Sequence, residues 1–192
     1  MNQKLDRKVF KVVLLDPPWI NKHVKRQKTY QSMSNHDIID SLPNVNDFIN
    51  EESLVMFWCT PSEKMQKAID DWLKIWNLVK KATWYWLKVT TFGEPVTKWE
   101  HPHKKPYEII VFAGKQENSV KLENEYIVTS VPSAIHSHKP PLWPLLRDMK
   151  ILDDNDECLE IFGRYLLPKT VTIGNQCLLF QDTNVFFPKY TF

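Results

Sequence analysis

The sequence contains very little glycine. Among its 192 residues only four are glycines, which are Gly93, Gly114, Gly163 and Gly174. Their spacing fits neither the G-x-G-x-x-G pattern of dinucleotide-binding folds nor the phosphate-binding loop. A nucleotide or cofactor bound by this chain is therefore expected to be held by side chains and not by a glycine-rich loop.

Cysteine is also scarce, and an excess of one charge and long apolar runs are missing. The three cysteines, Cys59, Cys158 and Cys177, lie in separate apolar runs, which argues against a disulfide framework or a zinc ribbon and predicts buried thiols in a reducing compartment. The formal net charge is only +2, so nucleic-acid binding would require a local basic cluster. No apolar run approaches about 18 residues, and the first residues are polar, so we expect neither a membrane span nor a signal peptide.

The remaining composition is that of a globular protein, with 43% hydrophobic and 25% charged residues, and predicts one domain over residues 1–192. Residues 9–15 form a short apolar run that stops at Asp16-Pro17-Pro18. Such a run is typical of a buried parallel strand whose C-terminal end carries the carboxylate. Open α/β sheets bind their ligands at that edge.

Further apolar runs predict the other elements of the fold. Strands are expected at residues 54–59, 84–89, 109–113, 126–130, 159–162 and 171–179, and helices at residues 35–42, 61–76 and 142–149. For the second helix, Thr60 is the candidate N-cap and Glu63 completes a capping box. Its apolar stripe predicts core packing and consists of Met65, Ile69, Trp72, Leu73 and Trp76. The pattern predicts an α/β domain with a mostly parallel sheet.

The tetrapeptide Asp16-Pro17-Pro18-Trp19 carries the clearest chemical signal. Its prolines lack N–H donors and restrict the backbone, so the carbonyls of Asp16 and Pro17 are expected to stay free to accept hydrogen bonds. A carboxylate, free carbonyls and an indole ring suit an exocyclic amine on a flat ring, with Trp19 stacked on that ring. The alternative is a strand followed by a polyproline turn with a packing tryptophan.

This motif after an apolar strand resembles the eukaryotic adenine-N6 methyltransferase family named after the seventy-kilodalton catalytic subunit of the mRNA methyltransferase. The chain is more similar to the branch called methyltransferase-like protein 4. The resemblance covers Asp16 to Gln176 in family order. It is carried by Asn21-Lys22, Val24-Lys25-Arg26, residues 103–108, Ser133, residues 135–142, residues 159–164 and Gly174-Asn175-Gln176.

The resemblance implies transfer of a methyl group from S-adenosylmethionine to adenine N6 in RNA or DNA, on a Rossmann-like sheet with permuted motif order. It implies that the adenine is bound and oriented by Asp16, Pro17, Pro18 and Trp19, and the cofactor by Lys139, Glu160, Arg164, Asn175 and Gln176. The sulfonium already activates the methyl group, so the protein has mainly to align the nitrogen and exclude water, and no metal is needed. The scarcity of glycine agrees, because this cofactor has no phosphate.

The chain departs from the family pattern at two places. Tyr165 stands where the closer relatives have asparagine, and only 15 residues precede Asp16. These departures are consistent with a fragment, with a minimal catalytic domain or with weakened cofactor binding. The alternative function is a catalytically weak or inactive nucleic-acid-binding subunit of a methyltransferase complex. A third hypothesis, methylation of an amine on a small molecule or protein, leaves the basic residues near the motif unexplained.

These basic residues predict a nucleic-acid partner containing adenine. Lys22, Lys25 and Arg26 lie beside the proposed adenine site, and Lys104 and Lys105 follow in a later loop. Phosphate contacts would explain them, and an ordinary solvated loop is the alternative. A protein partner subunit is a further expectation. We also expect the protein to be located in the nucleus, with the cytosol as the alternative.

Histidine pairs occur at His101 and His103 and at His136 and His138. They do not predict a metal site, because no Cys, Asp or Glu completes the usual ligand spacing.

Overall fold

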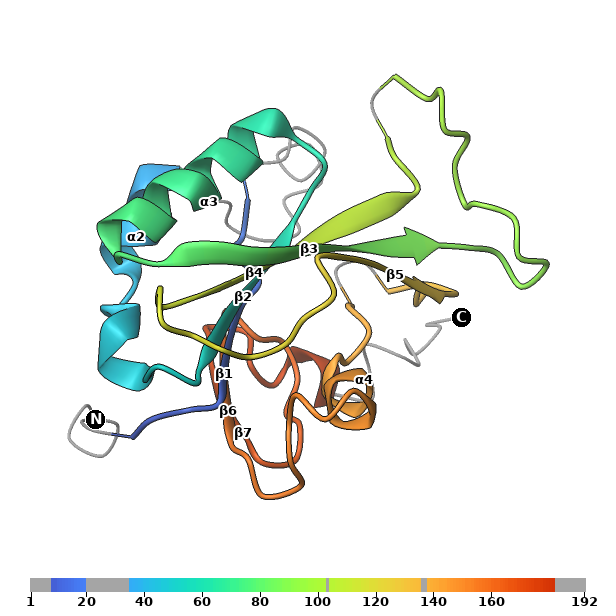
Figure 1. The fold of residues 1–192 in the computed structure, drawn as a ribbon. Helices are drawn as coiled ribbons and strands as arrows, with labels where there is room; N and C mark the ends of the chain where they lie inside the picture. The colour runs from blue at the N-terminus through green and yellow to red at the C-terminus, as the bar shows by residue number, and fades with distance from the viewer. Residues whose placement is uncertain (1–7, 20–34, 103, 136–137, 182–192) are drawn as a thin grey trace.

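The computed structural model describes residues 8–19, 35–102, 104–135 and 138–181. Within them the strands form a single sheet in the order β5-β3-β4-β2-β1-β6-β7 (Figure 1). β4 is antiparallel to both neighbours, whereas the other adjacent pairs are parallel. The strands are β1 (Val12–Leu15), β2 (Leu54–Cys59), β3 (Val79–Lys88), β4 (Tyr107–Gly114), β5 (Glu125–Ser130), β6 (Cys158–Ile161) and β7 (Thr170–Ile173). The predicted α/β fold with a mostly parallel, Rossmann-like sheet is confirmed.

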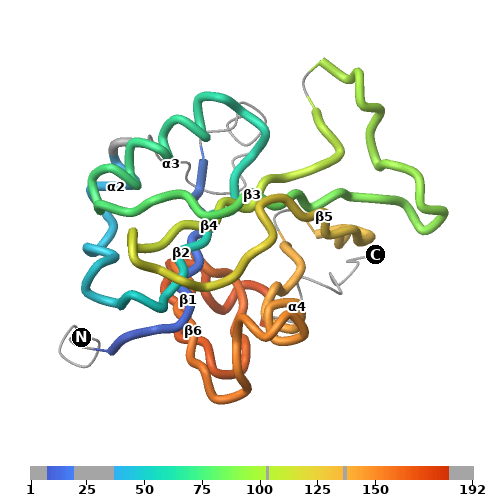
Figure 2. The backbone as a smooth tube through the Cα atoms, viewed as in Figure 1, coloured from blue at the N-terminus to red at the C-terminus, as the bar shows by residue number. Residues whose placement is uncertain are grey.

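Helices cover both faces of the sheet. α2 (Asn35–Ser41) and α3 (Glu63–Ile75) lie on one face and α4 (Trp143–Asp148) on the other, with short 3-10 turns η1 (Val45–Phe48) and η2 (Leu179–Gln181) (Figures 1 and 2). Because both faces are covered, β1 and β2 are buried at every position, as their continuous apolar runs predicted. None of the described helices is long and apolar enough to cross a membrane.

The apolar stripe of α3 packs as predicted, but the start of the helix differs. Its five stripe residues are all buried. The N-cap is Ser62, whose side chain makes no capping hydrogen bond, so the predicted cap at Thr60 with a capping box is wrong. The carbonyl of Ser62 accepts hydrogen bonds from the N–H groups of both Met65 and Gln66 at 3.0 Å. The helix therefore starts by backbone geometry, without help from a capping side chain.

Other predicted bounds shift for local reasons. β7 ends at Ile173, well before the predicted residue 179, and the chain turns at Gly174 toward η2. Trp99 is 50% exposed on the long connection between β3 and β4, which projects away from the sheet in Figure 1, so this tryptophan lies outside the core. All three cysteines are free; Cys59 and Cys158 are buried as predicted, whereas Cys177 is only half-buried, so the prediction is wrong for that thiol.

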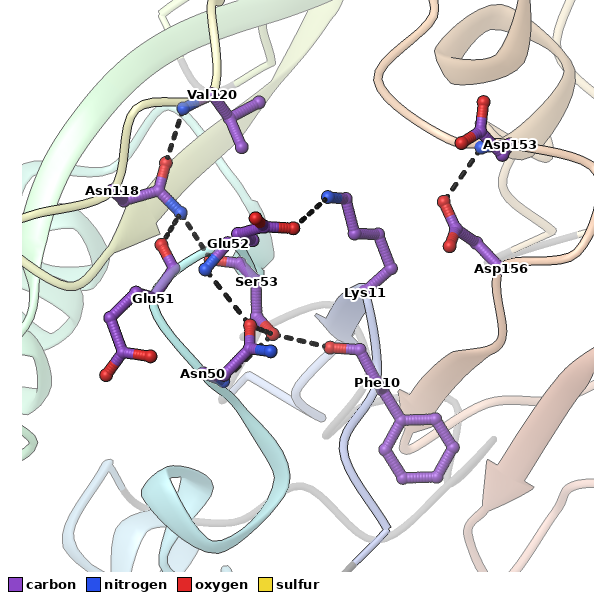
Figure 3. Close-up of polar contacts among 10 residues, drawn as sticks. All are labelled: Phe10, Lys11, Asn50, Glu51, Glu52, Ser53, Asn118, Val120, Asp153 and Asp156. Carbon is purple, nitrogen blue, oxygen red and sulfur yellow. Dashed lines mark hydrogen bonds and ion pairs between the residues drawn. The ribbon is translucent and has the colours of Figure 1, made fainter.

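A polar network closes the sheet edge at which β1 and β2 begin (Figure 3). The hydroxyl of Ser53 donates to the Phe10 carbonyl at 2.7 Å. The Asn118 amide donates to the carbonyls of Glu51 at 2.8 Å and Ser53 at 2.9 Å, and its oxygen accepts from the Val120 N–H at 3.1 Å. These bonds satisfy buried polar groups and join the starts of two strands to the loop after β4. These hydrogen bonds therefore stabilise the end of the sheet at which β1 and β2 begin.

Candidate active site at the carboxyl edge of the sheet

Charged side chains from neighbouring strands meet at the opposite edge of the sheet. Asp16 directly follows β1 and Glu160 lies in β6, which pairs with β1 in parallel. Because β4 runs antiparallel, it begins at this same edge, and Glu108 is its second residue. Lys88 ends β3, beside the start of β4. The topology thus gathers three acids and a lysine from four strands.

Lys139 links two of these acids. Its Nζ lies 2.6 Å from Glu108 Oε2 and 3.3 Å from Asp16 Oδ1, and Lys88 pairs with the other oxygen of Glu108. The Lys139 ammonium also lies 5.2 Å from the centroid of the Trp58 ring. The result is a chain of alternating charges, Asp16, Lys139, Glu108 and Lys88, that balance one another.

The ion pairs dominate the protonation of this cluster. Burial by itself would raise the pKa of Glu108, but the neighbouring charges of Lys139 and Lys88 outweigh burial and lower it to about 2. Burial would likewise lower the pKa of Lys139, yet the charges of Asp16 and Glu108 raise it above its ordinary value. Opposite charges at short range favour the ionised form of both partners. Glu108 and Lys139 therefore remain charged at neutral pH.

Glu160 has the opposite character. It is 4% exposed, and its Oε2 has no hydrogen-bond partner among the residues that the structure describes. Burial and the nearby charge of Asp16 raise the pKa of Glu160 to about 8, although Arg164 partly offsets them. A buried acceptor without a partner is costly, and functional sites are a common place for one. Glu160 is thus a candidate ligand-binding carboxyl group.

Gly163 makes room for Glu160. A Cβ on Gly163 would lie 2.4 Å from Thr172 Cγ2 and 3.0 Å from Glu160 Cδ. The N–H groups of Phe162 and Gly163 both donate to the Ile173 carbonyl, at 2.7 and 3.2 Å, which holds this turn tightly against β7. Only a residue without a side chain fits between the two strand ends.

Replacing Gly163 with alanine is expected to destabilise the protein by about 1–3 kcal/mol, the usual cost of overpacking. The nearest obstacle is the methyl group of Thr172, so Thr172→Ser in the same chain should restore part of the loss. Denaturant unfolding of the two single variants and the double variant measures this. Additive effects of the two substitutions would contradict the assigned clash.

The Asp16-Pro17-Pro18-Trp19 motif differs in part from its prediction. Asp16 is 8% exposed. The Pro17 carbonyl, expected to be free, accepts the Trp19 N–H at 2.8 Å. The Trp19 ring stacks on Trp72 at 5.3 Å between centroids, and its indole N–H donates to the Trp58 carbonyl at 3.0 Å. With only 6% exposure, this ring packs in the core and does not offer a face to a substrate in this conformation.

The other predicted residues are placed as follows. Arg164 is buried at the same edge, whereas Gln176 is half-buried and Asn175 is exposed in the turn after β7. Lys104 and Lys105 are exposed on the β3–β4 connection. Lys22, Lys25 and Arg26 lie outside the described residues, as do His103 and His136. In the described part of the chain, no group of three or more potential ligands could hold a metal ion.

Tyr165 contributes to the same edge. Its hydroxyl donates to the Lys139 carbonyl at 3.4 Å, and its ring meets His138 edge-on at 5.6 Å. Burial, together with the charges of Glu160 and Asp16, raises the pKa of Tyr165 above its ordinary value. The phenol therefore lies near both acids and supports the backbone at Lys139.

Sequence reasoning gave no role to Glu108 or Lys88. Their signal was present, since each lies where a charged residue meets the end of an apolar strand. However, Glu108 is 20 residues from Lys88 and 31 residues from Lys139, its two partners, and no local spacing reveals these pairings.

Comparison with known proteins gives consistent matches. The sequence profile of the MT-A70 family matches residues 10–176. A Caenorhabditis elegans protein named "DNA N6-methyl methyltransferase" is 36% identical in an alignment of length 181, which covers 93% of this chain and 48% of that protein. The mouse "N(6)-adenine-specific methyltransferase METTL4" is 36% identical in an alignment of length 191, which covers 93% of this chain and 40% of that protein.

A fungal relative has a different named substrate. The "N6-methyladenosine RNA methyltransferase MTA1" of Pyricularia oryzae is 31% identical in an alignment of length 184, which covers 90% of this chain and 48% of that protein. The chain thus spans less than half the length of these curated relatives.

Proposed function

The chain belongs to the MT-A70 family, and from this premise we propose that it transfers a methyl group from S-adenosylmethionine to the N6 amine of adenine in RNA or DNA. Its relatives are named as adenine-N6 methyltransferases, with DNA named for the nematode protein and RNA for the fungal one. The observation that carries the proposal is the buried Asp16 carboxylate, positioned by Lys139 at the carboxyl end of β1.

In this proposal Asp16 orients the reacting amine. A carboxylate only accepts hydrogen bonds, and it has sites beyond the one that faces Lys139. It can therefore accept an N6 hydrogen of adenine and turn the nitrogen lone pair toward the methyl donor. Alignment of this kind supplies much of the catalysis when the donor is already reactive. Trp19 anchors the motif to β2, because its indole N–H donates to the Trp58 carbonyl.

The described residues fit the cofactor. The unpartnered Oε2 of Glu160 would be satisfied by a hydroxyl or ammonium donor, and S-adenosylmethionine carries both. When bound, the cofactor supplies the electrophilic methyl group. The other residues proposed to hold it are Lys139, Arg164, Asn175 and Gln176. The absence of a glycine-rich loop is consistent with a ligand that has no phosphate.

We place the nucleic acid along the edge that bears the site. Lys104 and Lys105 are exposed on a connection that leaves β3 at Lys88 and returns at the start of β4, so both of its ends lie at the site. Lysines there would contact phosphates beside the target base. A base in a duplex has to be flipped out to reach such a buried acid, which favours single-stranded substrates.

A catalytically weak nucleic-acid-binding subunit is the second candidate. Tyr165 favours it, because the phenol occupies space near Glu160 and Asp16 and its hydroxyl is bonded to the Lys139 carbonyl. Such a subunit would bind oligonucleotides in a salt-dependent way and would have no measurable affinity for S-adenosylmethionine.

A transfer assay separates the two candidates. The protein is incubated with isotope-labelled S-adenosylmethionine and single-stranded RNA or DNA, beside Asp16→Ala and an oligonucleotide whose adenines carry an N6-methyl group already. We expect label in the unmethylated adenine strand with wild type alone. Calorimetric titration with the cofactor runs in parallel. Cofactor binding without transfer above the Asp16→Ala background would exclude the proposed activity.

A further inference from the structure

Glu108 lies between two lysines at the edge of the site. On β4 it shares a face with Ile110, whose partner in the ladder is Trp58 of β2. Oε2 of Glu108 accepts from Lys139 at 2.6 Å, and Oε1 accepts from Lys88. Each carboxylate oxygen thus has its own cation. Neither lysine is a neighbour of Glu108 in sequence, so the arrangement depends on the sheet.

The two anions around Lys139 are not equivalent. Its distance to Glu108 is 2.6 Å, whereas its distance to Asp16 is 3.3 Å. Charge-assisted N–H···O bonds usually measure about 2.7–2.9 Å, so the ammonium is bound to Glu108 and only loosely to Asp16. The Asp16 carboxylate therefore retains most of its capacity to accept a hydrogen bond.

We propose that Glu108, neutralised by Lys88, is a positioning residue that holds the Lys139 ammonium away from Asp16 and so keeps the Asp16 carboxylate available to the substrate amine. This inference rests on the proposed methyl transfer. Glu108 acts through Lys139 and does not itself contact the reacting atoms. Without its charge, Asp16 becomes the only carboxylate paired with Lys139 among the residues that the structure describes, and the ammonium closes onto it.

Burial makes this competition effective. The side chains of Asp16, Glu108 and Lys139 are only 11, 16 and 14% exposed, so water screens their interactions weakly. The Lys139 ammonium also lies 5.2 Å from the Trp58 ring centroid, and this cation–π contact favours its position beside the two acids.

Lys88 is held in place independently. Its ammonium lies 4.6 Å from the centroid of the Trp86 ring, and the Trp86 indole N–H donates to Ser130 Oγ at 2.8 Å. These contacts tie Lys88 to the paired strands β3 and β5. Because Lys88 balances the charge of Glu108, its removal should strengthen the pull of Glu108 on Lys139 and draw the ammonium further from Asp16. Asp16 would then lose the cation that orients it.

The decisive variant is Glu108→Gln, which keeps the shape and removes the charge. We expect kcat for methyl transfer to fall between about 10-fold and 100-fold, the scale of a misplaced catalytic group. Because Lys139 is also proposed to hold the cofactor, the calorimetric Kd for S-adenosylmethionine is measured alongside, and kcat is taken at saturating cofactor. Lys88→Gln should also lower kcat, whereas Lys88→Arg should retain it because the charge is preserved. A weaker cofactor Kd with unchanged kcat would overturn the proposal.

A second readout needs no activity. Lys139 is labelled with an amine-directed acylating reagent near pH 10, and its rate is measured by mass spectrometry of the protein without cofactor. Loss of the Glu108 charge should leave more of Lys139 deprotonated, so Glu108→Gln should be labelled faster than wild type. Equal rates would show that Glu108 does not hold the ammonium and would overturn the proposal.

The matched control is Glu157→Gln, which removes a 2.7 Å ion pair with Lys8 near the start of β6 and should leave kcat and Lys139 labelling unchanged. If a denaturant titration shows that Glu108→Gln is not folded, the comparison of Lys88→Gln with Lys88→Arg tests the proposal instead. If the wild-type protein shows no methyl transfer, the proposed function is wrong. If the wild type is active and Glu108→Gln is equally active, only the positioning role of Glu108 is wrong.

Discussion

Asp16→Asn is expected to lower kcat for methyl transfer by roughly 100-fold or more, because a slightly misplaced reacting group alone can cost this much. The reason lies in Lys139. An ammonium can only donate hydrogen bonds, so Lys139 will orient the asparagine with its carbonyl oxygen toward Nζ, now 3.3 Å from Asp16 Oδ1. The amide NH2 is then left facing the substrate. Two donors face each other, and the N6 amine loses its acceptor.

The measurement is steady-state transfer to an adenine oligonucleotide, with a cofactor titration alongside it. We expect the cofactor Kd to change little compared with kcat. The control is Asp71→Asn, which removes an exposed pair with Lys74 on α3 and should leave transfer unaffected. If Asp16→Asn retains transfer within a few-fold of wild type, the carboxylate is not the acceptor that orients the amine.

Glu160→Gln is expected to make the protein more stable at alkaline pH. Burial and the charge of Asp16 raise the pKa of Glu160 from 4.5 to about 8, so between these values the folded protein holds a proton that the unfolded chain releases. The free energy of unfolding therefore falls as pH rises through this window and levels off above about pH 8. Glutamine does not titrate. At pH 9 the variant should exceed wild type by several kcal/mol, since each pKa unit is worth about 1.4 kcal/mol.

Denaturant unfolding of both proteins at pH 5 and pH 9 tests this. The other titrating groups are common to both proteins, so the difference between the two free energies of unfolding isolates Glu160. We expect that difference to favour the variant far more at pH 9 than at pH 5. A difference independent of pH would mean that the folded state does not perturb Glu160.

The same substitution should weaken cofactor binding, because it replaces the carboxyl oxygen that we propose as an acceptor. Stability and function would then be opposed at Glu160. This opposition is common at binding sites, where a group unfavourable to the folded state is retained for its ligand. Glu160 combines burial, an unpartnered oxygen and a raised pKa, which together distinguish it from a purely structural acid.

Most of the sheet could be predicted from the sequence. The run at residues 54–59 became β2 with the predicted bounds, because a strand buried on both faces has a continuous apolar pattern. Bounds were less predictable where local and tertiary preferences compete. β7 stops at Ile173, before Gly174-Asn175-Gln176, although apolar residues return at Cys177, and α3 starts at Glu63 after the N-cap Ser62, without the cap that Thr60 suggested.

The candidate site was predicted in part. Asp16 could be placed at the carboxyl edge, because residues that follow parallel strands collect there, whereas Glu160 was assigned to the cofactor only through the family resemblance. Trp19 was assigned to base stacking from its residue type, and only the packing against Trp72 shows that its ring belongs to the core. Residue type alone does not tell which side of a turn a ring will occupy.

By itself the sequence determined the class of fold, the family resemblance and the acid at the end of β1, since these depend on local patterns and motif order. The tertiary structure decided which charges meet. Antiparallel β4 brings Glu108 to the carboxyl edge, and there it binds Lys88 and Lys139. Electrostatic interactions depend on distance in space and on burial, and neither can be read from separation along the chain.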